Sequence, residues 1–379
     1  MNRWLLAILV GLFANAIAFG QYAPAGNEHP ESDIDVEGHD HITPFGPTEL
    51  LEQTPEQKAE FAQALDLGPL RSVAVFHDGR VKILDTLARE KIRTLTGRET
   101  YEELVLAPGA EPLSSEVDRY AIADPSRFDK GRFDPLFVLL DLSIDPAHYA
   151  DRPLISVDYL PVRGYYLQGA FPSDEARQDL WLRMTRVSPI MIETLSQPIF
   201  DRYGHLEPVR TSIGRVDNAL RQAANAGGAL RVDDPWVHIE DLSESHPARS
   251  AALELGRAWR ALDIEAANRA VGTLAAELNA INPHTHSDTR ARLELMYNRG
   301  NLFDLGMSAY GLSFLALVLA FGTGRKWLIG LGVGLLVGAM ILHGTGFVLR
   351  CIIAERFAIQ NQFESMTGLS FFASLIGLG

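Results

Sequence analysis

The sequence has few of the residues that cross-linked and metal-clustered folds require. It contains one cysteine among 379 residues, Cys351, which excludes an intrachain disulfide, a CxxC redox pair and a thiolate zinc cluster. Basic residues are also outnumbered, with 34 Lys and Arg against 48 Asp and Glu and a net charge of −14. This deficit excludes a general nucleic-acid binder, because such binding requires a run of phosphates to be neutralised.

Common catalytic motifs are absent as well. We find no nucleophile elbow, no Gly-rich phosphate loop and no HExxH zinc motif, so an exported hydrolase is kept only as a distant third interpretation. Two His-x-His pairs, His39/His41 and His284/His286, offer good metal ligands but lack a third and fourth ligand at a defined spacing. We interpret them as solvated loop histidines and predict no metal site.

The charges that are present lie unevenly along the chain. Residues 302–379 hold four basic and three acidic side chains, a net charge of +1, so the residues before them carry a net charge of −15. The sequence therefore predicts an acidic, polar body followed by a nearly neutral, Gly-rich apolar tail. As a fold class, we predict a mostly α protein in which an exported, helix-rich α+β domain precedes a transmembrane α-helical bundle segment.

The amino terminus has the pattern of an export signal. Met1-Asn2-Arg3 is a short positive region, Trp4 to Phe13 is apolar, and small residues suitable for cleavage surround Ala18. We predict a signal peptide over residues 1–20, with an uncleaved N-terminal anchor as the alternative; both would export the body. Residues 21–46 are rich in Pro, Gly and charged residues, which predicts an acidic flexible linker.

Residues 47–300 are expected to form the exported, periplasmic domain. A β-hairpin is predicted near residues 72–84, because Asp78-Gly79 supplies a tight turn between two apolar runs. We expect Asp85 or Thr86 to cap the next helix and Gly97 to end it. A further strand is predicted at 154–159. Apolar spacing predicts amphipathic helices at Ser173 to Val187, Glu207 to Ala224, Pro247 to Leu262 and Ile264 to Ile281, the last two as an antiparallel hairpin.

The tail contains two apolar segments long enough to cross a membrane, at about 305–321 and 327–349, and a third from about 367 that is too short. If the body lies outside, the Arg325-Lys326 turn is cytoplasmic, in agreement with the positive-inside rule. Three glycines spaced four residues apart, Gly330, Gly334 and Gly338, form a small-residue ridge that permits close approach of another helix. The tail is therefore expected to pack in a bundle.

Three residues of the tail are candidates for binding heme. His343 lies within the second apolar segment, where a histidine is costly, so it is either a heme axial ligand or a residue hydrogen-bonded to a neighbouring helix. Arg350 and Arg356, near the end of that segment, are candidate contacts for heme propionates. Their alternative role is anchoring at lipid headgroups. Heme is thus a hypothesis at this stage.

Three separated elements resemble a known family. They are Gly79-Arg80-Val81-Lys82-Ile83-Leu84-Asp85-Thr86, then Glu294-Leu295-Met296-Tyr297-Asn298-Arg299, and finally His343 to Arg350 with Asn361, Glu364 and Ser365. In this order they resemble elements of the CcsA-type proteins of System II cytochrome c biogenesis. The alternative for Asn361 and Glu364 is a capping box at the third helix.

The resemblance implies a multi-pass protein of the cell inner membrane that brings heme to the outer face and presents it to the CxxCH thiols of apocytochrome c. It implies a CcsB/ResB-type partner, and at most a share in a heme lyase activity. The family's Trp-rich loop is missing, and Ala358, Phe363 and Ile83 depart from its motifs. We therefore expect an amino-terminal piece that requires further membrane helices. The alternative function is a membrane-anchored exported scaffold without heme.

Overall fold

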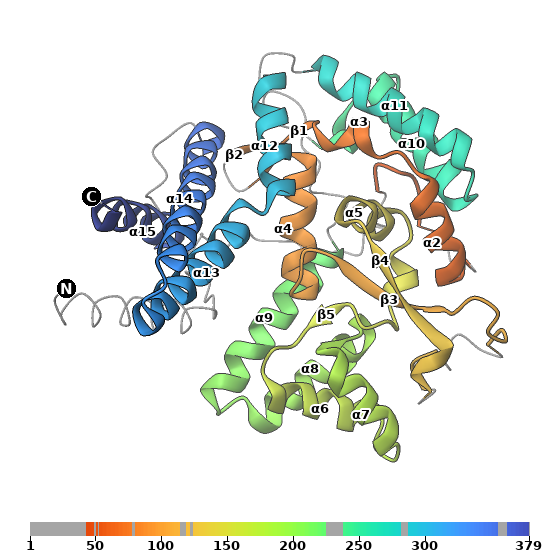
Figure 1. Ribbon diagram of the computed structural model, residues 1–379. Helices are drawn as coiled ribbons and strands as arrows, with labels where there is room; N and C mark the ends of the chain where they lie inside the picture. Colours follow the sequence, from red (N-terminus) through yellow and green to blue (C-terminus); the bar gives the residue numbers. More distant parts are fainter. Residues whose placement is uncertain are drawn as a thin grey trace. The chain divides into compact units, whose positions relative to one another are not determined.

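The fold is built mainly from helices, with three two-stranded sheets among the described residues (Figure 1). The computed structural model describes residues 43–48, 51, 53–77, 80–113, 119–121, 124–224, 238–281, 287–354 and 362–378. The predicted helix-rich class with a few short strands is confirmed. The predicted signal or anchor, most of the predicted linker and both His-x-His pairs lie outside the described residues.

The body consists of eleven described helices, several of which begin at side-chain caps. Thr54 and Gln57 form a reciprocal capping box at the first of them, and Asp134 and Ser188 cap two others. The helices are α2 (Pro55–Ala64), α3 (Gly68–Arg71), α4 (Leu84–Thr96), α5 (Pro135–Ile144), α6 (Leu160–Ala170), α7 (Glu175–Met184), α8 (Pro189–Tyr203), α9 (Glu207–Ala224), α10 (Pro247–Arg260), α11 (Ile264–Ile281) and α12 (Asp288–Gly300). Short 3₁₀ helices are η2 (Pro125–Arg127), η3 (Pro146–Tyr149) and η5 (Ile239–Asp241).

Helices with one apolar face lie where the sequence places them. The bounds of α9 and α11 equal the predicted ones, α10 ends two residues early, and α7 is shorter at both ends. The α10–α11 pair forms the expected hairpin, in which Asp263 accepts a hydrogen bond from the Ala266 amide at 3.0 Å. Leu262 makes the turn with a φ of 52°. The 3.6-residue apolar period was therefore a sufficient signal for these elements.

The three sheets are small and antiparallel. Strands β1 (Ala74–His77) and β2 (Arg80–Ile83) form a hairpin at the predicted place, with Ala74 opposite Ile83. Its Asp78-Gly79 turn lies outside the described residues. Strand β3 (Tyr101–Leu106) pairs with β4 (Phe128–Phe133), and β5 (Ile155–Ser156) pairs with β6 (Arg186–Val187). The strand predicted at 154–159 is thus only two residues long, because its partner β6 also has only two residues.

Helix α4 begins differently from the prediction. Its N-cap residue is Ile83, which makes no side-chain cap, so neither Asp85 nor Thr86 caps this helix. Asp85 binds two arginines instead, and Thr86 bonds to α12. The end of α4 is as predicted: Gly97 adopts a φ of 74°, the left-handed conformation that glycine enters without strain.

The core of the body surrounds α5, whose ten residues are all buried. A buried ionic cluster joins it to α2: Lys58 Nζ lies 2.7 Å from Asp141 Oδ1 and 2.8 Å from Asp145 Oδ2. Asp141 also accepts hydrogen bonds from the Tyr149 hydroxyl and from Trp259 Nε1, at 2.7 and 2.8 Å. These donors satisfy a carboxylate that is fully removed from water. Phe45, placed by the sequence in the linker, is also fully buried.

Among the described residues, two helices are long and apolar enough to cross a membrane: α13 (Leu302–Thr323) and α14 (Lys326–Ala354). The third helix, α15 (Gln362–Leu378), begins at residue 362 rather than at 367, because the polar residues before the apolar run also join the helix. In the contact of α13 with α14, the Ser313 hydroxyl donates to the Gly332 carbonyl at 2.6 Å. A methyl group on Gly330, Gly334 or Gly338 would meet nothing within 4 Å in the described structure. The predicted ridge is therefore not the surface against which α13 packs.

Candidate functional site at the motif junction

The three elements that carry the family resemblance come together around α12. Figure 1 shows α12 beside α4 and next to the α13–α14 pair, and contacts join it to both α4 and α14. We use the term motif junction for Asp85, Thr86, Glu294, Tyr297, Asn298, Arg350 and Glu364. The junction connects the body to the apolar helices through side chains that are distant in the sequence.

One side of the motif junction is formed by α4 and α12. The Thr86 hydroxyl donates to Glu294 Oε1 at 2.5 Å, and the Ile83 amide lies 3.4 Å from the same oxygen. One helical turn later, Asn298 Nδ2 donates to Thr86 Oγ1 at 2.9 Å and to Asp85 Oδ2 at 3.1 Å. The four-residue spacing of Glu294 and Asn298 places both on the same face of α12.

Asp85 lies at the centre of an arginine pair. Its fully buried carboxylate is 2.5 Å from Arg71 Nη1 and 2.9 Å from Arg89 Nε. Burial by itself raises the pKa of Asp85, but Arg89 and Arg71 outweigh it and hold that pKa below its ordinary value. Arg71 also binds Asp134 at 2.7 Å, at the start of α5. Asp85 therefore links the motif junction to the core.

The pKa of Glu294 is displaced in the opposite direction to that of Asp85. It is 2% exposed, and burial raises its pKa; the hydrogen bonds from Thr86 and the Ile83 amide offset only part of this effect. A carboxyl group held in this way favours the protonated form more than a carboxyl in water does. Two acidic residues of one junction, Asp85 and Glu294, therefore have pKa values displaced in opposite directions.

Arg80 and Lys82, the basic residues of the first element, both bind Glu90 of α4. Arg80 Nη2 and Lys82 Nζ each lie 2.5 Å from a Glu90 carboxylate oxygen. These contacts hold β2 against α4, and the Lys82 side chain is only 2% exposed. Both residues thus support the hairpin. Gly79, in the same element, lies outside the described residues.

The other side of the motif junction joins α12 to α14 and α15. Arg290 Nη2 donates to the Ile353 carbonyl at 2.7 Å. Arg350 lies over the Tyr297 ring, 6.0 Å from its centroid, and its Nε is 3.4 Å from Glu364 Oε1. Glu364, in the first turn of α15, is thus a carboxylate partner for Arg350.

The other residues of the apolar tail that the sequence analysis named are not part of the motif junction. Ser365 follows Glu364 in α15 and is exposed. Arg356 and Asn361 lie outside the described residues, so the capping box proposed for Asn361 is not described. Cys351 is free and half-buried.

His343 takes the arrangement of a histidine bonded to a neighbouring helix. Its Nε2 is 3.1 Å from the Thr367 carbonyl of α15, and its Nδ1 is 3.5 Å from the Tyr310 hydroxyl of α13. The rings of Phe303 and Phe371 enclose the imidazole, at centroid distances of 5.6 and 5.5 Å. An axial heme ligand requires an imidazole nitrogen open to the iron. In this conformation the surroundings of His343 do not fit such a ligand.

Sequence reasoning identified the residues of the first and third elements but assigned no role to Glu294, Tyr297 or Asn298. The available signal was their position in a helix immediately before an apolar segment, with a carboxylate and an amide four residues apart. Their partners cannot be read from the sequence, because Thr86 is 208 residues away from Glu294. Among the described residues, no group of three or more His, Cys, Asp or Glu is arranged to hold a metal ion.

Comparison of the sequence with protein-family models and with curated proteins finds no match to either. The site is therefore characterised by its own geometry and by the three short elements that meet in it.

Proposed function

We propose that the chain is a membrane component of System II cytochrome c maturation of the CcsA type. The observation that carries the proposal is the meeting of three family-like elements, far apart in the sequence, through partly buried hydrogen bonds and the contact of Arg350 with the Tyr297 ring at the motif junction. Independent chance resemblances have no reason to share one site. In this proposal, the junction couples an extramembrane body to the helices that span the membrane.

The proposed topology places the body, about residues 21–300, on the exported side of the inner membrane. Helix α13 then runs inward, the Arg325-Lys326 turn is cytoplasmic, and α14 returns to the outer face. The motif junction is consequently at the outer face, where apocytochrome c and a CcsB/ResB-type partner are reached. Membrane lipid surrounds the exposed apolar side chains of α13 and α14.

Heme is the cargo in this proposal. Two of the three candidate heme contacts are engaged by the protein itself, because Thr367 and Tyr310 face the nitrogens of His343 and Glu364 pairs with Arg350; Arg356 lies outside the described residues. We therefore assign no step to these residues. The same observation favours the second candidate function, a membrane-anchored exported scaffold that binds assembly partners without heme.

Heme retention by the full chain distinguishes the two functions. The chain is expressed in a bacterial membrane, extracted in mild detergent, and its Soret absorbance is measured per mole of protein. The maturation proposal predicts retained heme and co-purification of an apocytochrome c carrying a CxxCH motif. His343→Ala tests the ligand hypothesis, with His205→Ala, at an exposed position, as the control. Co-purified apocytochrome c without any Soret absorbance would support the scaffold function. Absence of both the apocytochrome c and the Soret absorbance would refute the maturation proposal.

A further inference from the structure

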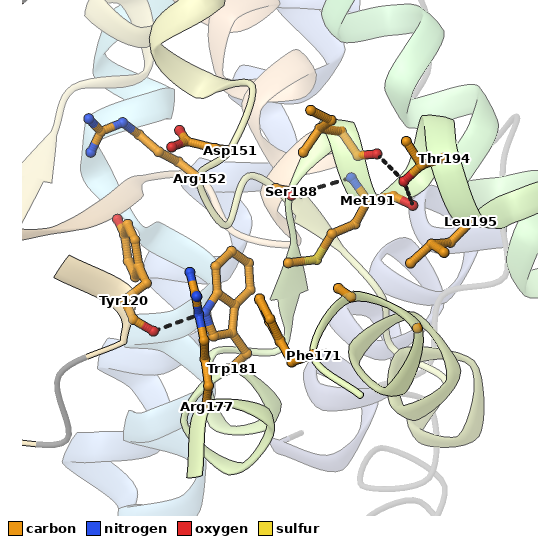
Figure 2. Close-up of a pocket in the computed structure, with 13 residues that line it drawn as sticks. Tyr120, Asp151, Arg152, Phe171, Arg177, Trp181, Ser188, Met191, Thr194 and Leu195 are labelled. Carbon is orange, nitrogen blue, oxygen red and sulfur yellow. Dashed lines mark hydrogen bonds between the residues drawn. The ribbon is translucent and has the colours of Figure 1, made fainter. Parts of the chain in front are cut away.

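A cavity of about 380 Å³ lies between α6, α7 and α8, formed by other parts of the body than the motif junction. Figure 2 shows Trp181 and Tyr120 on one side of it and Met191 on the other, with Asp151 and Arg152 at a third side. A volume of this size is in the range of small-molecule sites. Neither the sequence reasoning nor the proposed function assigns a role to this cavity.

The apolar part of the cavity is an ordered aromatic wall. Trp181 is 1% exposed, and its Nε1 donates to the Tyr120 carbonyl at 3.2 Å. The rings of Tyr120 and Phe171 lie 5.6 and 5.7 Å from the Trp181 ring, between centroids. Because its hydrogen bond and neighbours fix the indole, this apolar wall is already ordered, and binding carries no cost for ordering it.

The polar group of the cavity is the guanidinium of Arg177. It lies over the Phe171 ring, 4.3 Å from the centroid. Its Nε is shielded from solvent and has no hydrogen-bond partner, and within the described part of the chain no carboxylate forms an ion pair with it. Because no carboxylate of the described residues neutralises this guanidinium, an oxygen anion bound in the cavity beside it is favoured.

Of the other charged groups at the cavity, Arg152 is engaged elsewhere and Asp151 is exposed. Arg152 donates through Nη1 to Glu103 and through Nε to the His148 carbonyl. Burial lowers the pKa of the Arg152 guanidinium, but Glu103 and, to a smaller extent, the exposed Asp151 raise that pKa above its ordinary value. The positive charge of Arg177 is thus the one that a ligand meets beside the aromatic wall.

We propose that this cavity binds an apolar carboxylate, with its ring or branched chain against Trp181 and Met191 and its carboxylate on Arg177. Two sources have this chemistry: a free hydrophobic acid and the C-terminal residue of a peptide. The site is independent of the proposed function, since none of its residues belongs to the motif junction.

The test uses equilibrium dialysis of the full chain in lipid nanodiscs with 1-naphthoate and with its uncharged analogue 1-naphthamide. We expect naphthoate to bind about tenfold more tightly than naphthamide, because a charge-assisted hydrogen bond contributes a free energy of that order to binding. Arg177→Met is expected to reduce naphthoate binding to the level of naphthamide. Arg183→Met, an exposed position of the same helix, is the matched control and leaves binding unchanged.

Further measurements identify where the probes bind and which of the two ligand sources the site takes. Ala170→Trp, which fills the cavity lining, is expected to abolish binding of both probes above the lipid background. A short peptide ending in a Phe with a free carboxylate is compared with the same peptide as its C-terminal amide. If the free-acid peptide binds and the amide does not, the ligand is the C-terminal residue of a peptide. If naphthoate binds and neither peptide does, the ligand is a free hydrophobic acid. If Arg177→Met does not fold, Arg177→Lys replaces it in the test. This variant keeps the positive charge and is expected to retain part of the affinity for naphthoate. Equal binding of naphthoate and naphthamide, or unchanged binding in Ala170→Trp, would overturn the proposal.

Discussion

Thr86 and Glu294 are 208 residues apart in the chain, yet the Thr86 hydroxyl donates to Glu294 Oε1 at 2.5 Å. Glu294 is 2% exposed and Thr86 is half-buried, so this hydrogen bond is partly shielded from water. It closes the body by attaching α12, the last helix before the apolar segments, to α4 near its start. Polar contacts at α12 therefore connect the apolar helices to the body.

Thr86→Val removes the hydroxyl at nearly constant volume and is expected to destabilise the motif junction. The loss should be about 1–3 kcal/mol, because a buried acceptor on Glu294 loses its short hydrogen bond. Denaturant unfolding of the full chain in detergent measures this change. Thr94→Val is the matched control, since the exposed Thr94 hydroxyl donates only to a carbonyl of its own helix. An unfolding free energy equal for both variants would contradict the role of Thr86.

The opposite pKa displacements of Glu294 and Asp85 predict opposite pH dependences. Glu294 has a raised pKa in the folded protein, so its contribution to stability is complete below its ordinary value of 4.5 and is lost as the pH rises through the folded pKa. Asp85 has a lowered pKa, so its contribution is complete above its ordinary value of 3.8 and is lost as the pH falls through the folded pKa.

Glu294→Gln should therefore gain in stability relative to the unmodified chain as the pH rises above 4.5. Asp85→Asn should be less stable than the unmodified chain at neutral pH, and this difference should shrink in acid. Thermal melting of the three proteins over a pH series measures both trends. Parallel pH curves for the two variants would show that the two carboxyl groups do not have these opposite environments.

The Arg350–Glu364 pair predicts energetic coupling between α14 and α15. Because the Glu364 side chain is 1% exposed, removal of the guanidinium 3.4 Å away takes a positive charge from beside a buried carboxylate. We expect Arg350→Gln to destabilise the chain by about 3–5 kcal/mol, and Glu364→Gln to cancel part of that loss in the double variant. A double-mutant cycle by thermal unfolding in detergent measures the coupling. Strictly additive losses would show that the pair is not energetically coupled.

Replacement of Lys58 is expected to destabilise the core of the body strongly. Lys58→Met leaves Asp141 and Asp145 buried without the cation that lies within 2.8 Å of each, at a cost of about 3–5 kcal/mol. Denaturant unfolding monitored by Trp fluorescence is suited to this test, because Trp259 contacts Asp141 directly. The control is Lys130→Met, whose side chain is 74% exposed and whose loss should cost less than about 1 kcal/mol.

Two glycines of α14 form a matched pair. A Cβ at Gly332 would lie 2.6 Å from Leu317 Cγ and 3.3 Å from its backbone nitrogen, whereas a Cβ at Gly334 meets nothing within 4 Å among the described atoms. Gly332→Ala should therefore separate α13 from α14 and lower stability. Gly334→Ala should be neutral or stabilising by up to about 1 kcal/mol, because alanine favours the helix. Thermal unfolding in detergent compares them, and a stable Gly332→Ala variant would contradict this close packing.

Local patterns were sufficient for elements whose formation depends on nearby residues. One apolar face every 3.6 residues indicated α9 and α11 with their observed bounds, and the Asp-Gly pair indicated the β1–β2 hairpin. Gly97 ended α4 as predicted, since a left-handed residue is a local requirement. Long apolar runs likewise indicated α13 and α14, because a span requires length and composition alone.

Elements governed by distant contacts were not predictable in this way. Helix α5 is buried on all sides and has no apolar period to detect, because the core surrounds it completely. The β3–β4 pair was missed too, since strand pairing is settled by a partner about 30 residues away.

The sequence alone determined the division of this protein into an acidic helical body and apolar helices, and it identified the three short elements that resemble a family. Only the tertiary structure decided that these elements meet at α12, that Asp85 pairs with arginines instead of capping α4, and that His343 bonds to Thr367. The physical reason is that composition and period are local properties of the chain. The partner of a buried polar group, in contrast, is set by which distant segments the fold brings within hydrogen-bonding distance.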